Sequence, residues 1–383
     1  MSLGFDFLRR QWRLIAGIAI VLTVCAGMVF SVVHKLKNRE RERHVNQGQY
    51  HFNRQEHEAA IREFTEAIRI DPRCAVAYAN RASSYFNRGE LDRAIEDCNR
   101  ALQINPRLIL AYANRAGAFL TQGDNDRAIA DCRQAIELDP QSALAYANRG
   151  AAHLNKGELD DAIADCTRAI ELDPQSALAF ANRGAAHFNK GELDQAVMDC
   201  SRALMCDPSL SIASLNRAAA FLSKGDWDSA IADCDRTLRL NPDLARAYAL
   251  RGTAFFNKGV NEQAIADDDE ALRRAPNLAF VHANRGAAYL RLGNAEKALP
   301  DFDRAIEFEP LMAAAYAYRS VIYLNRGDNK KVIADCTRAL EIDPHLPLAY
   351  WNRGIAYTRQ GDAKCAQEDR KKALELDPSL EQP

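Results

Sequence analysis

The sequence predicts an all-α solenoid of ten 34-residue helix-turn-helix repeats, preceded by one transmembrane helix. Three observations carry the prediction of repeats: proline recurs at a fixed interval, glycine recurs near the middle of each interval, and two further positions are almost always alanine. The prolines lie 34 residues apart, at Pro72, Pro106, Pro140, Pro174, Pro208, Pro242, Pro276, Pro310, Pro344 and Pro378. A fixed period of this length is typical of solenoids, in which each repeat buries its apolar face against its neighbours.

The repeats extend from Arg41 to Leu380, and each is expected to contain two helices. In the fourth repeat, apolar residues at helical spacing predict a first helix over 143–155 and a second over 159–172. The period sets the repeat boundaries at 41–74, 75–108, 109–142, 143–176, 177–210, 211–244, 245–278, 279–312, 313–346 and 347–380.

Glycine occupies the joint between the two helices in nine of the ten repeats, as Gly157 does in the fourth. Helices often end at a left-handed residue, a conformation that glycine adopts without strain. The proline near the end of each repeat suits the first turn of a following helix but not a helix interior. Alanine at the twentieth and twenty-seventh positions allows two antiparallel helices to approach closely.

Together with an aromatic residue at the fourth position, these features resemble the tetratricopeptide repeat (TPR) family. The resemblance covers residues 41–380, and the aromatic residues are Tyr78, Tyr112, Tyr146, Phe180, Tyr248, Tyr316 and Tyr350. It implies a right-handed superhelix whose concave wall is lined by the first helix of each repeat. It also implies binding of partner proteins or peptides, without any chemistry of the repeats' own.

Residues 14–33 form a run of twenty residues without a charge, LIAGIAIVLTVCAGMVFSVV. This length can cross a hydrocarbon core of about 30 Å, so we predict a transmembrane helix, between an N-terminal tail (1–13) and a charged juxtamembrane linker (34–40). The alternative is a cleaved lipoprotein signal ending before Cys25. Val24 replaces the small residue that such a signal needs there, and the apolar run continues past Cys25, so an uncleaved anchor is preferred.

The sequence contains opposing signals for the side of the membrane on which the repeats lie. Five Lys and Arg residues follow the span within ten residues and three precede it, which favours the repeats on the cytoplasmic side. The short arginine-bearing tail resists translocation and argues for a periplasmic or extracytoplasmic domain instead. Six of the ten cysteines recur at the twenty-fourth position, where we expect unpaired buried thiols, and these favour the cytoplasm: Cys98, Cys132, Cys166, Cys200, Cys234 and Cys336.

Asparagine recurs at the sixth position of the first helix. Because asparagine is a poor residue for a helix interior, its recurrence needs a reason, and an amide can bind the N–H and C=O groups of an extended peptide. This row resembles the asparagine ladder of the O-linked N-acetylglucosamine transferase TPR domain. The alternative is that the amides bond between neighbouring helices. The predicted peptide-binding residues are Asn80, Asn114, Asn148, Asn182, Asn216, Asn284 and Asn352.

Arginine at the seventh position and aspartate at the twenty-third recur together in repeats two to ten. In a folded hairpin these positions lie at equal height, so they are expected to form a structural Arg-Asp ladder. The alternative is that some arginines bind a partner's carboxylates. A TPR carboxylate clamp is disfavoured, because Leu110 and Asn114 stand where it needs cationic residues.

The net charge of −2, without a basic face, disfavours nucleic acid as a partner. We find no catalytic constellation, so we predict no enzyme activity, no cofactor, no metal and no small-molecule substrate. The predicted function is a membrane-anchored TPR scaffold or adaptor that binds extended peptide segments of partner proteins. The alternatives are a dedicated assembly factor for one membrane or envelope complex and, third, a regulatory part of an enzyme.

Overall fold

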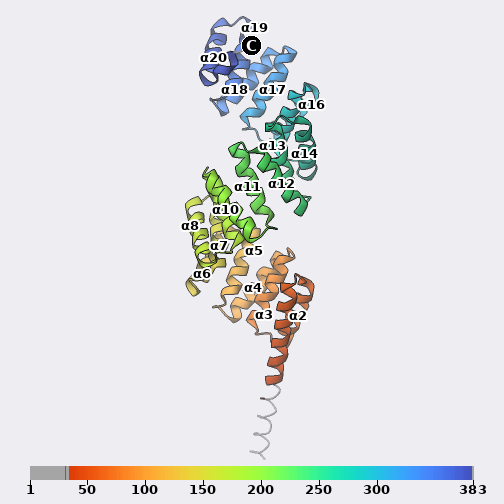
Figure 1. The fold of residues 1–383 in the computed structure, drawn as a ribbon, viewed down its shortest axis with the longest axis vertical. Helices are drawn as coiled ribbons and strands as arrows, with labels where there is room; N and C mark the ends of the chain where they lie inside the picture. Colours follow the sequence, from red (N-terminus) through yellow and green to blue (C-terminus); the bar gives the residue numbers. More distant parts are fainter. Residues whose placement is uncertain (1–30, 32–33, 382–383) are drawn as a thin grey trace, which may run out of the picture. The chain divides into compact units, whose positions relative to one another are not determined.

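A computed structural model describes residue 31 and residues 34–381, which contain helices and turns but no strand (Figure 1). The chain divides into two compact bodies, one ending at Arg183 and the other beginning at Gly184. The predicted transmembrane segment, 14–33, lies outside the described residues apart from residue 31. In the part that the structure describes, no helix is both long and apolar enough to cross a membrane.

The N-terminal body begins with a helix over 34–53, so residues 34–40, predicted as a charged linker, belong to the same helix as the start of the first repeat. The helices that follow are α2 (His57–Ile70), α3 (Ala75–Asn87), α4 (Leu91–Ile104), α5 (Ile109–Thr121), α6 (Asn125–Leu138), α7 (Ala143–Lys156), α8 (Leu159–Leu172) and the start of α9 (Ala177–Asn189).

The C-terminal body continues the alternation of first and second helices. It contains the end of α9, then α10 (Leu193–Cys206), α11 (Ser211–Lys224), α12 (Trp227–Leu240), α13 (Ala245–Asn257), α14 (Asn261–Arg274), α15 (Ala279–Arg291), α16 (Ala295–Phe308), α17 (Ala313–Arg326), α18 (Asn329–Ile342), α19 (Pro347–Gln360), α20 (Ala363–Leu376) and the 3-10 helix Pro378–Glu381. The predicted all-α helical-repeat solenoid is therefore confirmed within each body.

The joint between the two helices is a left-handed residue in every repeat. The nine joint glycines have φ between 74° and 84°, as the sequence predicts. The first repeat has Gln55 there, and it takes the same conformation, with φ 62°. The turn geometry is thus set by the packing of the two helices, and glycine only lowers its cost.

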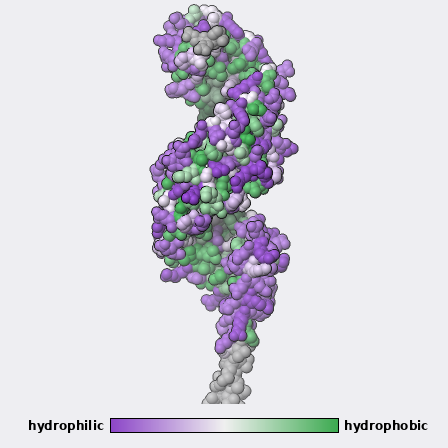
Figure 2. Space-filling view, viewed as in Figure 1, coloured by the Kyte–Doolittle hydropathy of each residue, from purple (hydrophilic) through white to green (hydrophobic). Residues whose placement is uncertain are grey.

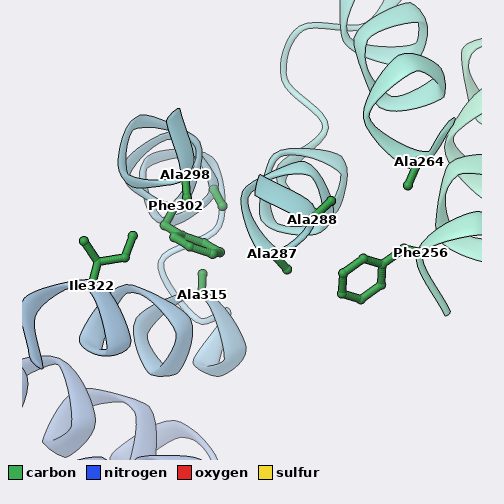
Figure 3. Packing of buried hydrophobic residues seen from close by; sticks show 9 residues of the cluster. Phe256, Ala264, Ala287, Ala288, Ala298, Phe302, Ala315 and Ile322 are labelled. Atoms are coloured by element: carbon green, nitrogen blue, oxygen red, sulfur yellow. The ribbon is translucent and has the colours of Figure 1, made fainter. Parts of the chain in front are cut away.

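Alanine and cysteine fill the contact between the paired helices. Ala128, Cys132 and Ala135 of α6 are fully buried, and the same positions are buried in most repeats. In the eighth repeat Phe302 replaces the cysteine, and its ring lies beside Ala298, Ala315 and Ile322 (Figure 3). The larger residue fits because Gly286 on the facing helix has no side chain at this contact, where an added Cβ would lie 3.0 Å from the Phe302 ring.

Candidate peptide-binding surface

Four positions of each first helix share one face, because the second, sixth, ninth and thirteenth residues of a repeat are spaced three or four apart. We call this face the first-helix stripe. In α3, α5 and α7 of the N-terminal body it consists of Val76, Asn80, Ser83 and Asn87, then Leu110, Asn114, Gly117 and Thr121, then Leu144, Asn148, Ala151 and Asn155.

The second position of the stripe is apolar and exposed in consecutive repeats. The side chains of Val76, Leu110, Leu144 and Leu178 are 36–48% exposed, although the alanines one residue further along are fully buried. Apolar surface is visible around α5 in the N-terminal body (Figure 2). Single exposed leucines are ordinary, but a row of them at one repeat position is a continuous apolar edge.

In repeats two to ten the stripe holds no acidic residue, whereas the first repeat has Glu42 at the second position. In repeats two to six its four positions hold no charged residue, and in repeats seven to ten the only charged residues are Arg246, Arg291 and Arg359. This contrasts with a chain in which 27% of residues are charged. The composition excludes a partner held mainly by ion pairs to the stripe of α3, α5 and α7.

Three asparagines of the stripe donate hydrogen bonds to main-chain or hydroxyl groups of the preceding repeat. Nδ2 of Asn114 donates to the Ala79 carbonyl at 3.0 Å and to Ser83 Oγ at 2.7 Å. Nδ2 of Asn148 donates to the Ala113 carbonyl at 3.2 Å. In the C-terminal body Asn352 donates to Ser320 Oγ at 3.0 Å. These amides therefore join neighbouring repeats, the alternative that the sequence left open.

The same bonds fix which way each amide faces. A main-chain carbonyl can only accept, so the NH2 group of Asn114 and Asn148 must point toward the preceding repeat. Their Oδ1 atoms have no hydrogen-bond partner among the described residues; Asn114 is half-buried, whereas Asn148 is only 7% exposed. Each of these two asparagines thus keeps only an unpartnered acceptor, where the sequence predicted both a donor and an acceptor, and Asn114 is the less buried of the two.

The other predicted asparagines are placed differently. The side chains of Asn80 and Asn216 are half-buried and make no hydrogen bond within the described part of the chain. Nδ2 of Asn182 is buried without a partner. Asn284 donates to Asp268 Oδ2 at 2.9 Å. The seven asparagines share a repeat position but not one set of contacts, and their role in peptide binding stays a prediction.

The ladder pairs that the described structure specifies, eight of them, are bidentate ion pairs. In the third repeat, Arg115 donates Nε and Nη2 to the two carboxylate oxygens of Asp131 at 2.7 and 2.6 Å. These hydrogen bonds raise the pKa of the guanidinium. The pairs are Arg81–Asp97, Arg115–Asp131, Arg149–Asp165, Arg217–Asp233, Arg251–Asp267, Arg285–Asp301, Arg319–Asp335 and Arg353–Asp369.

The third guanidinium nitrogen, Nη1, contacts the second helix of the preceding repeat. Nη1 of Arg115 donates to Asn99, and Nη1 of Arg285 donates to Asp269, both at 2.6 Å. Sequence spacing predicted the pair within a repeat but not this link between repeats. One guanidinium therefore ties three helices together, and these arginines are committed to the protein itself.

Asp268 occupies the cysteine position of the seventh repeat and is fully buried. Burial raises the pKa of this carboxyl group to about 8. Its Oδ1 has no hydrogen-bond partner in the described structure. A carboxyl group whose charged form is disfavoured by burial here fills the space of a thiol.

One group of side chains in the described residues has the spacing of metal ligands: His153, Glu158 and Asp161, with ligand atoms within 4.8 Å of one another. Glu158 already accepts hydrogen bonds from His153 Nδ1 at 2.5 Å and contacts Lys156 Nζ at 3.0 Å. The positively charged Lys156 ammonium would repel a metal ion beside Glu158. His153 and Lys156 account for the contacts of Glu158 without a metal.

Comparison with protein families gives matches to tetratricopeptide repeat models over most of the chain. The matched residues are 42–74, 75–108, 114–177, 152–211, 215–279, 279–310 and 348–380. A search of the curated proteins gave no match.

Among solved structures, the Cut9-Hcn1 hetero-tetramer of APC/C aligns with a TM-score of 0.58 and 14% identity, over 90% of this chain and 82% of that one. A tetratricopeptide repeat protein from Parabacteroides merdae aligns with a TM-score of 0.48 and 17% identity, over 70% and 98%. YrrB, a TPR protein with an unusual peptide-binding site, aligns with a TM-score of 0.41 and 24% identity, over 48% and 95%. The first of these likenesses supports the fold.

Proposed function

Because this chain belongs to the tetratricopeptide repeat family, whose fold suits the binding of proteins or peptides, we propose that it is a scaffold or adaptor for extended segments of partner proteins. The segment lies along the first-helix stripe of α3, α5, α7 and the start of α9. The proposal includes a membrane anchor at residues 14–33, which rests on the uncharged run in the sequence.

The observation that carries the proposal is the exposed apolar row of Val76, Leu110, Leu144 and Leu178. Beside it, the unpartnered Oδ1 atoms of Asn114 and Asn148 offer acceptors for the main-chain N–H groups of an extended peptide. Apolar contacts supply affinity, and acceptors at the repeat spacing hold a backbone without reading its side chains. The segment we expect is therefore extended, rich in apolar residues and not strongly charged.

A random-peptide selection on the full-length protein in detergent tests this. We expect the enriched peptides to bind in a fluorescence anisotropy assay, and the triple variant Leu110→Ser, Leu144→Ser, Leu178→Ser to weaken that binding at least about tenfold, since several apolar contacts are lost together. The matched control is Met205→Ser, Leu240→Ser, Leu311→Ser, which removes three exposed apolar side chains outside the stripe.

Equal binding by both triple variants would overturn the assignment of the stripe. The sequence range of the selected peptides also separates the two leading functions. A scaffold or adaptor is expected to select many unrelated apolar sequences, whereas a dedicated assembly factor is expected to select one narrow motif.

A further inference from the structure

The last repeat contains a pocket that no other repeat has the residues to form. A cavity of about 320 Å³ lies between α19 and α20, at the lower end of the size range of ligand sites. Trp351, Gly354, Ile355, Thr358 and Arg359 of α19 line it together with Arg370 of α20. Trp351 supplies an aromatic wall, and Gly354 lies against the backbone of α20, where an added Cβ would come within 3.3 Å of the Ala366 carbonyl oxygen.

In earlier repeats the equivalent surface is a contact between repeats. The fifth position is the buried Ala79 in the second repeat, and Asn114 of the third repeat bonds to its carbonyl. The twenty-fourth position there is the fully buried Cys98. In the tenth repeat these two positions are Trp351 and Arg370, and no helix of the described residues covers them.

The charges of the pocket are both positive. The guanidinium carbon of Arg370 lies 5.1 Å from the centre of the Trp351 ring, a cation-π distance. Nη1 of Arg359 donates to the Leu324 carbonyl at 2.7 Å, which fixes the position of that side chain. Neither arginine has a carboxylate within ion-pair distance in the described part of the chain, although most other arginines of the repeats do.

The two positive charges indicate which kind of partner the pocket can bind. A covering segment that brings no carboxylate would bury Arg370 unpaired, which is costly. Two copies meeting by this face would also bring Arg359 and Arg370 of each copy against their equivalents. An anion that carries an apolar group satisfies the arginines and the tryptophan together.

We propose that the Trp351–Arg359–Arg370 pocket binds a carboxylate of an acidic peptide segment, with an apolar side chain of the same segment against Trp351. The carboxylate comes either from the peptide's carboxyl terminus or from an Asp or Glu side chain. The pocket adds a second contact for partner segments to the proposed function. It lies in the C-terminal body and uses none of the residues of α3, α5 or α7.

The test is anisotropy with the full chain in detergent and fluorescein-labelled Gly-Ser-Gly-Asp-Glu-Asp-Phe as the probe. Arg370→Gln is expected to weaken binding about tenfold or more, and Arg370→Lys to give an intermediate loss, because lysine keeps the charge but not the planar fork. The control Lys364→Gln removes one charge from the same helix at an exposed position outside the pocket, so its binding should stay within about twofold.

Two further probes identify the source of the carboxylate. An amidated carboxyl terminus abolishes binding if the terminus is bound, and replacement of the acidic side chains by amides abolishes it if they are bound. Equal affinity of Arg370→Gln and Lys364→Gln for the original probe, with both variants folded by circular dichroism, overturns the proposal. The stripe variant Leu110→Ser, Leu144→Ser, Leu178→Ser should bind this probe normally, so failure of the pocket and failure of the stripe are distinguishable.

Discussion

Asn284 donates its side-chain amide to Oδ2 of Asp268 across 2.9 Å. The contact joins the sixth-position asparagine of the eighth repeat to Asp268, the one acidic residue at the twenty-fourth position, where six repeats have cysteine. It satisfies one oxygen of a fully buried carboxyl group and leaves the other, Oδ1, without a partner among the described residues. The seventh and eighth repeats therefore contain a group whose protonation affects folding.

The first prediction concerns the pH dependence of stability at Asp268. Because burial raises its pKa to about 8 in the folded state, the folded protein holds a proton that the unfolded chain releases near pH 4. The folded state binds more protons between these values, so stability falls as pH rises from about 4 to about 8. Asp268→Asn should remove this loss and be more stable than the wild type by a few kcal/mol at pH 8.

Urea unfolding of the wild type and Asp268→Asn at a series of pH values measures the difference. Asp269→Asn is the control, because Asp269 is exposed and pairs with Arg285. A stability difference for Asp268→Asn that stays constant from pH 5 to pH 9 would contradict the prediction.

The second prediction concerns the ladder pair of the eighth repeat. Burial raises the pKa of Asp301, but hydrogen bonds from His282 and Arg285 outweigh it, and the pKa lies below its usual value. Its contribution to stability is therefore present above about pH 4 and is lost as pH falls through the lowered pKa. Asp301→Asn should cost roughly 3 kcal/mol at pH 7, because the buried His282 and two nitrogens of the partly buried Arg285 guanidinium lose their carboxylate.

Asp303→Asn is the matched control for this second prediction. Asp303 also pairs with an arginine, Arg319, but its side chain is half exposed, so the loss should stay below about 1 kcal/mol. Thermal or urea unfolding of the two variants under the same conditions decides the matter. A similar cost for both would show that burial of the ladder aspartates adds no stability.

The third prediction concerns the asparagine row. Asn148→Ala leaves the Ala113 carbonyl without its partner, so it should cost roughly 0.5–1.5 kcal/mol. Asn216→Ala removes no hydrogen bond of the described structure and should cost nothing or stabilise slightly, because alanine is the better helix former. Melting temperatures of the two variants give the comparison. The reverse order of stability would show that the amide bond between repeats is not the main role of Asn148.

The fourth prediction concerns the thiols. Burial raises the pKa of Cys98, Cys132, Cys200 and Cys234 to about 12, so almost no reactive thiolate exists at pH 7. A maleimide should label the less buried Cys74, Cys206 and Cys365 in the native protein, and should label the buried cysteines only after denaturation. Peptide mapping identifies the modified residues. Rapid native labelling of the cysteine row would mean that the repeats open frequently.

The fifth prediction concerns the anchor proposed at residues 14–33. An uncleaved apolar span should keep the full chain in the membrane fraction after carbonate extraction, and the intact mass should include Met1 or Ser2. Deletion of residues 1–33 should release the protein into the soluble fraction. A mature chain that begins at a lipid-modified Cys25 would replace the anchor with a lipoprotein signal.

The sequence alone determined the repeat, because each repeat position meets the same neighbours and so selects the same residue type. The 34-residue period, the joint glycines and the alanine positions predicted the paired helices, and helical spacing placed Arg115 opposite Asp131. These features depend on contacts within one repeat or at a fixed offset. A periodic pattern reports such contacts directly.

Features that depend on the direction in which a side chain points were decided only by the tertiary structure. By sequence alone, an asparagine at the sixth position could bind a ligand or a neighbouring repeat. In the structure, the amide nitrogen of Asn114 donates to the Ala79 carbonyl of the preceding repeat. The left-handed turn at Gln55 and the pocket between Trp351 and Arg370 were not predicted, because each is a single departure from the pattern. A repeat pattern predicts what all repeats share, whereas a departure takes its meaning from the atoms packed around it.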